Sequence, residues 1–253
     1  HLTTVSAAMN ALGWSNYAND HEDGNGQFEQ NFQFADALTT ADRVVTLRYL
    51  LSVLAAERGM IATFMPKPFS DRTGSGLHLH LSLTSAGTPV FPDDTDERGL
   101  GLSPTAYAFV GGILDHACAL QALIGPTVNS YKRTGALTTA SGASWAPRTP
   151  TYGGNDRTHY VRIPDDQRIE LRGGDGSANP YLAIAAALGA GIDGIKNRIE
   201  PPEPVDKDLY ELPPEEHAQI QQLPDSLGAA LDALEADHDF LTEGDVFTED
   251  LIS

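Results

Sequence analysis

The segment 77–83 constrains the fold of this chain most, because it alternates without a break between leucine and polar residues. Successive side chains of a β-strand point to opposite faces of a sheet. The alternation therefore predicts a half-buried strand with every leucine on one face. The other face carries His78, His80 and Ser82. Two imidazoles and a hydroxyl in register indicate a functional site, and a solvated polar face is the alternative.

A second alternating segment, 167–172, predicts another strand. Its polar face carries Arg168, Glu170 and Arg172, and its apolar face carries Ile169 and Leu171. Arginines on both sides of a carboxylate suit an anion site around a metal-binding oxygen. A surface ion-pair ladder is the alternative, and such ladders are common.

The remaining pattern favours an α+β fold over a doubly wound parallel sheet, because isolated strands and hairpin-like strand pairs alternate with helices. A third strand is predicted at 157–164, joined to 167–172 by a turn at 165–166. The predicted helices span 40–58 (capped by Thr39 or Thr40 and ended by Gly59), 104 to about 123, 180 to about 198, 214–222 and 225–239. The stretch 125–154 has no periodicity, and long irregular segments of this kind are usually functional.

The charge balance excludes some partners. With 35 acidic residues against 16 basic ones, the net charge is −19, which argues against nucleic-acid binding. The scarcity of lysine predicts a halophilic protein whose self-repulsion is screened by salt; a merely acidic cytosolic protein is the alternative. No apolar run is long enough to cross a bilayer, so no membrane association is expected. A single cysteine and no secretory signal predict a cytoplasmic location.

Two groups of residues suggest chemistry on phosphate. Glu22 and Glu29 flank a glycine-rich turn, and their oxygens suit Mg²⁺ or Mn²⁺, although an acidic loop is the alternative. Six of the 12 arginines fall within forty residues, a concentration that suits phosphoryl transfer. The candidates among them are Arg133, Arg157, Arg162, Arg168 and Arg172. Neither a Walker nor a Rossmann glycine motif is present. The residues thus predict a metal-dependent, phosphate-handling enzyme.

Five motifs in a fixed order carry a family resemblance. They are Met-Pro-Lys-Pro at 65–68 followed by Gly-Ser-Gly-Leu-His-Leu-His at 74–80, Asn-Ser-Tyr-Lys-Arg at 129–133, the segment 155–164, Arg-Ile-Glu-Leu-Arg at 168–172, and Asn-Pro-Tyr-Leu at 179–182. With them the chain resembles the catalytic domain of glutamine synthetases. The resemblance implies an antiparallel sheet curved around a funnel-shaped site and homo-oligomeric rings with active sites between subunits.

The resemblance also implies a role for each matching residue. Glu22 and Glu29 would hold one Mg²⁺ or Mn²⁺, and His78 and Glu170 the other. ATP would contact His80, Ser82, Arg162 and Arg168. Glutamate would be bound by Gly74, Arg133 and Arg172, with Arg133 and Arg157 as the catalytic residues and Arg157 against the γ-phosphate. The implied reaction forms γ-glutamyl phosphate from glutamate and ATP, and ammonia then displaces phosphate to give glutamine.

Two departures from the family pattern stand out. The family's small N-terminal domain and its first metal-ligand strand have no counterpart in residues 1–253, which predicts a catalytic domain with an acidic helical extension at 200–253. The motif at 142–147 has Trp145 where ammonia-using members carry a glutamate. An indole suits the alkyl part of an amine. This motif and the segment 24–29 resemble the γ-glutamylpolyamine and γ-glutamylmethylamide synthetase branch.

Three alternatives to glutamine formation therefore stay open. The first is γ-glutamylamide synthesis with a primary amine or polyamine as the acceptor. The second is a non-catalytic structural relative, against which the full set of site residues counts. The third is a guanidino kinase, which the glutamates around Gln27 and the paired histidines disfavour.

Overall fold

The computed structural model describes residues 2–135, 144–205 and 220–252. The helices are α1 (Leu2–Ala11), α2 (Ala37–Ala56), α3 (Pro104–Asp115), α4 (Ala117–Ile124), α5 (Val128–Thr134), α6 (Pro180–Asn197), α8 (Leu227–Ala236), α9 (Asp239–Thr242), the 3₁₀ turn η2 (Glu243–Asp245) and α10 (Glu249–Ile252). The strands are β1 (Asn16–His21), β2 (Phe28–Phe32), β3 (Leu79–Leu81), β4 (Thr84–Ser85), β5 (Thr88–Pro89), β6 (Tyr152–Gly153), β7 (Val161–Asp165) and β8 (Arg168–Leu171).

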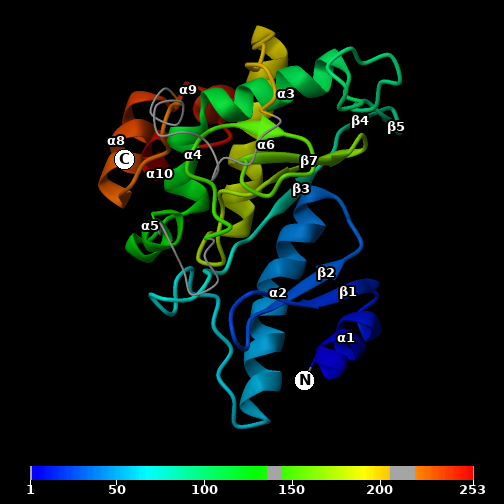
Figure 1. The fold of residues 1–253 in the computed structure, drawn as a ribbon, viewed down its shortest axis with the longest axis vertical. Coiled ribbons are helices and arrows are strands. Elements are labelled where there is room, and N and C mark those ends of the chain that lie inside the picture. Colours follow the sequence, from blue (N-terminus) through cyan, green and yellow to red (C-terminus); the bar gives the residue numbers. More distant parts are fainter. Residues whose placement is uncertain (1, 136–143, 206–219, 253) are drawn as a thin grey trace.

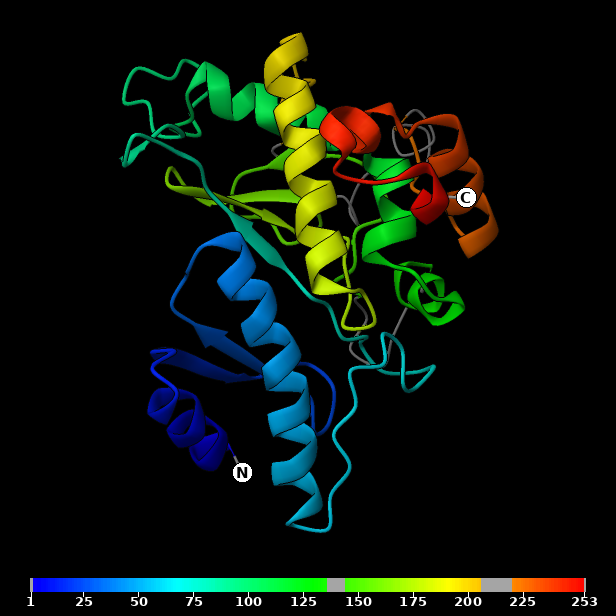
Figure 2. The ribbon, with the colours of Figure 1, turned by 180° about the vertical axis from the view of Figure 1, so that it is seen from behind.

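The molecule has two parts along its long axis (Figure 1). The N-terminal part consists of α1, the β1–β2 hairpin and α2. The larger part is a four-stranded sheet in the order β3-β8-β7-β6, covered on one face by α3, α4 and α6, as Figure 2 shows from behind. β8 pairs antiparallel with both β3 and β7, and β6 pairs parallel with β7. The predicted α+β class is confirmed, with a sheet that is antiparallel except at its β6 edge.

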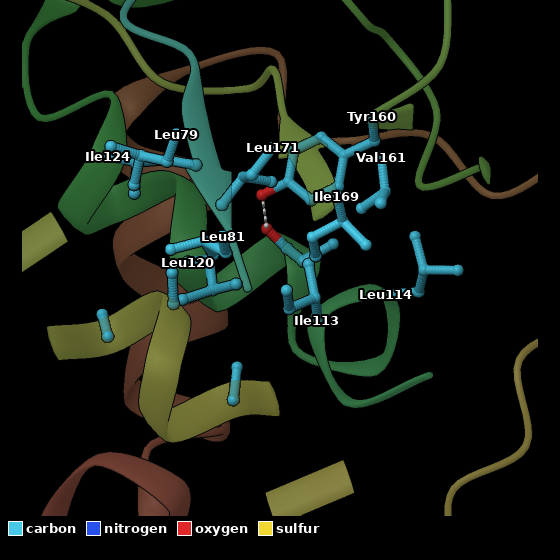
Figure 3. Close-up of a cluster of buried hydrophobic side chains, with 14 of the residues drawn as sticks. Leu79, Leu81, Ile113, Leu114, Leu120, Ile124, Tyr160, Val161, Ile169 and Leu171 are labelled. Atoms are coloured by element: carbon cyan, nitrogen blue, oxygen red, sulfur yellow. Dashed lines mark hydrogen bonds between the residues drawn. The ribbon is translucent and has the colours of Figure 1, made fainter. Parts of the chain in front are cut away.

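The alternating segments behave as predicted. Leu79 and Leu81 are buried, whereas His80 between them is exposed. In Figure 3 the side chains of these leucines lie in one cluster with Leu120 and Ile124 of α4 and with the apolar residues of β8. The regular strand is shorter than 77–83 because its entry is irregular: the N–H of Leu77 bonds to the carbonyl of Gly174 at 3.0 Å, outside the β3–β8 ladder.

The predicted helix 40–58 is confirmed as α2, but the predicted cap is wrong. Asp36 is the N-cap, and its carboxylate accepts from the N–H of Thr39 at 3.0 Å. Asparagine, aspartate and serine cap helices at least as well as threonine, so the earlier aspartate takes the position. The helix ends at Ala56, slightly before the predicted residue 58, and the chain turns away at Gly59, where φ is +66°.

The predicted long helix 104–123 begins at Pro104 after the Ser103 cap, as expected, but it breaks at His116. The two pieces, α3 and α4, meet at a bend of 74°. α3 crosses α6 so closely that a Cβ at Gly112 would lie 2.1 Å from the carbonyl oxygen of Ala190, which only glycine allows. Within the described ranges no single helix is long and apolar enough to cross a membrane; α3 and α4 reach that length and composition only when taken together across the bend.

Two further predictions need correction or lie beyond the described residues. The stretch 125–154 is not wholly irregular, because Thr127 and Ser130 form a reciprocal capping box that starts α5. The predicted helix 225–239 is present as α8, which Ser226 caps. The predicted helix 214–222 lies mostly outside the described residues. Its last residues, 220–222, are described and are not helical.

Candidate active site

Strand pairing builds the centre of the site. His80 of β3 and Arg162 of β7 lie opposite Glu170 of β8, from the two sides. Residues opposite each other in neighbouring strands share one face of a sheet. Since the leucines of β3 and the apolar residues of β8 fill the core face, these three polar side chains lie together on the other face.

Glu170 is the acid at the centre of this group, and its side chain is only 3% exposed. Its Oε1 accepts from Nη1 of Arg172 at 2.8 Å and from Nδ1 of His78 at 3.0 Å, and its Oε2 accepts from Nη1 of Arg162 at 2.6 Å. Burial alone would raise the pKa of Glu170, but the hydrogen bond from His78 and the guanidinium groups hold this pKa far below its ordinary value. Glu170 is therefore an ionised carboxylate that only accepts hydrogen bonds.

The two histidines of the 77–83 segment take opposite tautomers. Burial, helped by the charges of Arg172 and Arg133, lowers the pKa of His78, so the ring is neutral. Its Nδ1–H faces the ionised Glu170, which leaves the lone pair on Nε2. His80 differs, because its Nδ1 accepts from Nε–H of Arg168 at 3.1 Å, and its Nε2 faces Glu170 Oε1 at 3.9 Å. Partial desolvation by the surrounding side chains, with the charges of Arg168 and Arg162, also lowers the pKa of His80.

The predicted carboxylate pair lies on the β1–β2 hairpin. Glu22 follows β1 directly and Glu29 lies in β2, so the turn brings the two carboxyl groups together. Burial, then the charge of Glu29 and a hydrogen bond with it, raises the pKa of Glu22. A hydrogen bond between two carboxyl groups requires a shared proton. The charges of Glu29 and Glu170 both act on the pKa of His80. The carboxylate pair of the hairpin therefore lies near Glu170 and His80 of the sheet.

The arginines surround this centre. Arg133 of α5 is buried and donates from Nη1 to the carbonyl of Gly173 and from Nη2 to the carbonyl of Arg172, both at 3.1 Å. Arg157 is exposed, and its charge acts on both Glu22 and Arg172, which places it between the hairpin and the sheet. Gly74 packs against Arg133: a Cβ at Gly74 would lie 2.8 Å from Cγ of Arg133.

The residues predicted to contact ATP lie on β3, β7 and β8 or directly after β3. Arg168 bonds to His80 and pairs through Nη1 with Asp165 at 2.7 Å, whereas Arg162 donates from Nε to Asn155 at 2.9 Å. Ser82 follows β3 directly and is exposed. Four of these side chains thus border the same polar face, together with two partners, Asn155 and Asp165, that sequence reasoning did not identify. Asn155 lies within one of the motifs, which was the available signal.

Trp145 lies beside the cluster in an unusual conformation. Its φ is +55°, a region that residues with a side chain rarely adopt, and the residue is 42% exposed. Its carbonyl oxygen accepts from Nη2 of Arg172 at 3.3 Å. Residues 142 and 143 of the same motif lie outside the described part of the chain. The backbone at Trp145 is thus tied to an arginine of the site.

The candidate ligands include two neighbouring carboxyl groups. Such a pair suits a hard cation, and Mg²⁺ commonly takes one or two protein carboxylates and completes its shell with water and phosphate. Glu22 and Glu29 fit this description. Across 2–135, 144–205 and 220–252 no three His, Cys, Asp or Glu side chains gather to hold a metal ion. The four predicted ligands form two pairs, Glu22–Glu29 and His78–Glu170.

Comparison with known proteins gives the family context. The model of the family described as "Glutamine synthetase, catalytic domain" matches residues 1–253. A glutamine synthetase of Streptomyces coelicolor is 51% identical over 240 residues, which cover 92% of this chain and 49% of that protein. A glutamate–methylamine ligase of Methyloversatilis universalis is 46% identical over 238 residues, which cover 93% of this chain and 54% of that protein.

The solved structures agree. The structure titled "GmaS/ADP complex-Conformation 1" superimposes with a TM-score of 0.88 at 52% identity and covers 96% of this chain and 55% of that one. A ligand-free GmaS structure gives a TM-score of 0.85 at 50% identity and covers 95% of this chain and 54% of that one. The chain spans about half the length of the curated relatives and of the structures that it matches.

Proposed function

The chain belongs to the glutamine synthetase family, and from this premise we propose that the full-length protein is an ATP-dependent ligase that joins the γ-carboxylate of glutamate to nitrogen. The observation that carries the proposal is the charge arrangement at Glu170. In a chain with a net charge of −19, two guanidinium groups converge on one buried carboxylate, and Arg133 donates to the backbone beside them. Concentrated positive charge of this kind suits anionic substrates.

In this mechanism the arginines do most of the binding. Arg133, Arg172 and the backbone at Gly74 orient glutamate, and Arg162, Arg168, His80 and Ser82 bind ATP. The γ-carboxylate oxygen attacks the γ-phosphorus, the bond to the β–γ bridging oxygen breaks, and ADP leaves. Arg157 would hold the equatorial oxygens of the transferred group as their charge changes.

The divalent cation would be held by Glu22 and Glu29, with His78 Nε2 and Glu170 as the second pair. When bound, Mg²⁺ or Mn²⁺ would neutralise charge on the ATP phosphates. Nitrogen then displaces phosphate from γ-glutamyl phosphate, losing its proton to a base. Chelation of divalent ions is expected to stop phosphate release, and added Mg²⁺ or Mn²⁺ is expected to restore it.

Ammonia is the proposed acceptor, which makes glutamine the product. A primary amine or polyamine is a second candidate, for which two observations speak. The family resemblance puts Trp145 at the position of the ammonium-handling glutamate, and the chain is similar both to glutamine synthetases and to a glutamate–methylamine ligase. An aromatic ring binds the alkyl part of an amine, but it cannot take up a proton.

One experiment separates these candidates. Phosphate release from ATP and glutamate is followed with the full-length protein and ammonium, methylamine, ethanolamine or putrescine as acceptor. A higher kcat/KM with ammonium supports glutamine formation, and a higher value with an amine supports γ-glutamylamide synthesis. The absence of release with every acceptor would contradict the ligase and favour the non-catalytic relative.

The proposal extends to assembly and solution conditions. We propose that residues 1–253 form the catalytic domain of a protein that assembles as a homo-oligomer. The full-length protein would also carry the small domain and the metal-ligand strand of the family pattern. Light scattering after size-exclusion chromatography tests the oligomer. A halophilic protein should lose secondary structure as KCl is removed, because its acidic surface is then no longer screened.

A further inference from the structure

Gln27 lies at the tip of the β1–β2 hairpin, in the turn between Glu22 and Glu29. Its side chain folds back over the turn, and Oε1 accepts from the backbone N–H of Gly24 at 2.9 Å. A Cβ at Gly24 would lie 2.9 Å from that Oε1, so a side chain at this position would displace the Gln27 amide. Since an N–H can only donate, the orientation of the Gln27 amide is fixed, and Nε2 is directed out of the hairpin.

The outward Nε2 bonds the hairpin to the glycine loop, which we define as residues 73–76. It donates to the carbonyl oxygen of Gly74 at 2.9 Å and lies 3.4 Å from Oγ of Ser75. Beside this contact the Thr73 hydroxyl donates to the carboxylate of Asp23, also in the hairpin turn. Three consecutive residues of the glycine loop are therefore bonded to the hairpin that carries Glu22 and Glu29.

The opposite side of the glycine loop packs on the cluster at the sheet. A Cβ at Gly76 would lie 2.7 Å from Nε2 of His78 and 2.8 Å from Nη2 of Arg133, and Gly74 is as close to the Arg133 side chain. The N–H of Ser75 also bonds to the carbonyl of Pro66 at 2.8 Å. Packing this tight transmits a displacement, because the loop cannot move without moving Arg133 or His78.

We propose that Gln27 is a positioning residue that holds the Glu22–Glu29 pair in register with Arg133 and His78 through the glycine loop. The inference rests on the proposed function, in which a divalent cation binds the carboxylate pair and glutamate binds at Arg133. It has a thermodynamic consequence. Binding of Mn²⁺ and binding of glutamate strengthen each other by the same factor, because each orders the element that the other needs.

The test uses the full-length protein and three variants. Gln27→Glu keeps the shape of the side chain but replaces the donor to the Gly74 carbonyl by an acceptor. Thr73→Val removes the neighbouring bond to Asp23 with little change in volume. The control, Gln33→Glu, adds the same charge to the same hairpin just beyond the far end of β2. Mn²⁺ affinity is measured by electron paramagnetic resonance with and without glutamate, and KM and kcat are measured with ATP and acceptor.

We expect Gln27→Glu to weaken Mn²⁺ binding and to raise the KM for glutamate by about tenfold each, the size of one lost hydrogen bond, while kcat changes much less. The strengthening of Mn²⁺ binding by glutamate should disappear in this variant. Gln33→Glu should match the wild type. Thr73→Val should also weaken the coupling between Mn²⁺ and glutamate. If Gln27→Glu lowers the unfolding temperature, the coupling measured in Thr73→Val tests the proposal instead.

Equal Mn²⁺ affinity, coupling and KM in Gln27→Glu and Gln33→Glu would overturn the positioning role. This outcome is distinct from failure of the proposed function. If the wild type releases no phosphate with any acceptor, the ligase proposal fails, whereas the Mn²⁺ titrations with and without glutamate still support or overturn the role of Gln27.

Discussion

Two buried charge clusters of this molecule have opposite compositions. At Glu170 one carboxylate is surrounded by Arg162, Arg172 and His78. At the α3–α4 bend one imidazole, His116, lies between two carboxylates: Nδ1 is 2.8 Å from Oδ2 of Asp237, and Nε2 is 3.1 Å from Oδ2 of Asp193. The first cluster has an excess of positive charge and the second an excess of negative charge.

Their surroundings explain why only the first is a candidate site. The Glu170 cluster continues outward into exposed cationic groups, Arg157 and Arg168, so a bound anion can reach it. His116 instead stacks on Phe240, with ring centroids 4.0 Å apart, and both of its nitrogens are bonded. Its partners belong to α6 and to the end of α8, so the contacts join three helical segments. The comparison teaches that surplus positive charge continuing into exposed cationic groups indicates an anion site, whereas a cluster whose central ring is buried and bonded on both sides joins elements of the fold.

The largest effect is expected from Glu170→Gln. The variant leaves two guanidinium groups without their carboxylate, and Arg172 is buried, so unfolding free energy should fall by about 3 kcal/mol. Displacement of His78 and the arginines should lower kcat/KM by about a hundredfold or more. Denaturant unfolding and phosphate release measure the two effects. Wild-type activity in this variant would remove Glu170 from the site.

A smaller and purely structural effect is expected from His116→Gln. Glutamine can bond to one aspartate but carries no charge, so the second carboxylate loses its partner and the unfolding free energy should fall by about 2 kcal/mol. Activity at a temperature where the variant is folded should stay near that of the wild type. If kcat falls as strongly as in Glu170→Gln, the His116 cluster is not purely structural.

The pH dependence of stability should distinguish the clusters by sign. Burial would lower the pKa of His116, but its hydrogen bonds to Asp237 and Asp193 prevail and raise it. Its contribution is full below the unfolded-state pKa of about 6.5 and is lost as the pH rises through the raised folded-state pKa. The pKa of Glu170 is lowered, so its contribution is full above an unfolded-state pKa of about 4.3 and is lost as the pH falls.

The unfolding free energies of wild type and the two variants, measured across pH, test this contrast. The difference between wild type and His116→Gln should shrink on the alkaline side, and the difference for Glu170→Gln should shrink on the acid side. Both differences shrinking on the same side would contradict the assignment of charges.

The smallest effect is expected from Lys196→Ala. Lys196 pairs with Glu243, and both side chains are about half exposed (51% and 54%). A solvent-exposed pair contributes about 0.5 kcal/mol or less to the free energy of unfolding. Thermal unfolding at low and high salt measures this. A loss as large as that in His116→Gln would show that exposure does not separate surface pairs from buried clusters.

Much of the fold could be predicted from sequence because it depends on local periodicity. The alternation at 77–83 and 167–172 correctly assigned the apolar faces to the core, and Ser103-Pro104 and Asn179-Pro180 correctly marked helix starts. Two errors, the Asp36 cap and the start of α5, concern local signals, whereas the missed break in the helix 104–123 depends on distant contacts. The break at His116 coincides with bonds to residues 77 and 121 positions away, and no local pattern shows them.

The candidate site divides in the same way. The motifs singled out His78, Glu170 and the arginines, and the family resemblance already divided the four predicted ligands into the pairs Glu22–Glu29 and His78–Glu170. Gln27 was noted only for its neighbours, since its partner Gly74 lies 47 residues further along the chain. The opposite tautomers of His78 and His80 were also not predictable, because they depend on which groups face each ring.

The sequence by itself determined the family, the α+β class and which side chains share a face, because the geometry of a strand or helix repeats over a few residues. Only the tertiary structure decided which charges meet: Glu170 with two arginines, His116 with two aspartates, and the hairpin tip with the glycine loop. The physical reason is that pKa values, tautomers and ion pairs depend on burial and on distance in space. Both are fixed only when remote segments pack together.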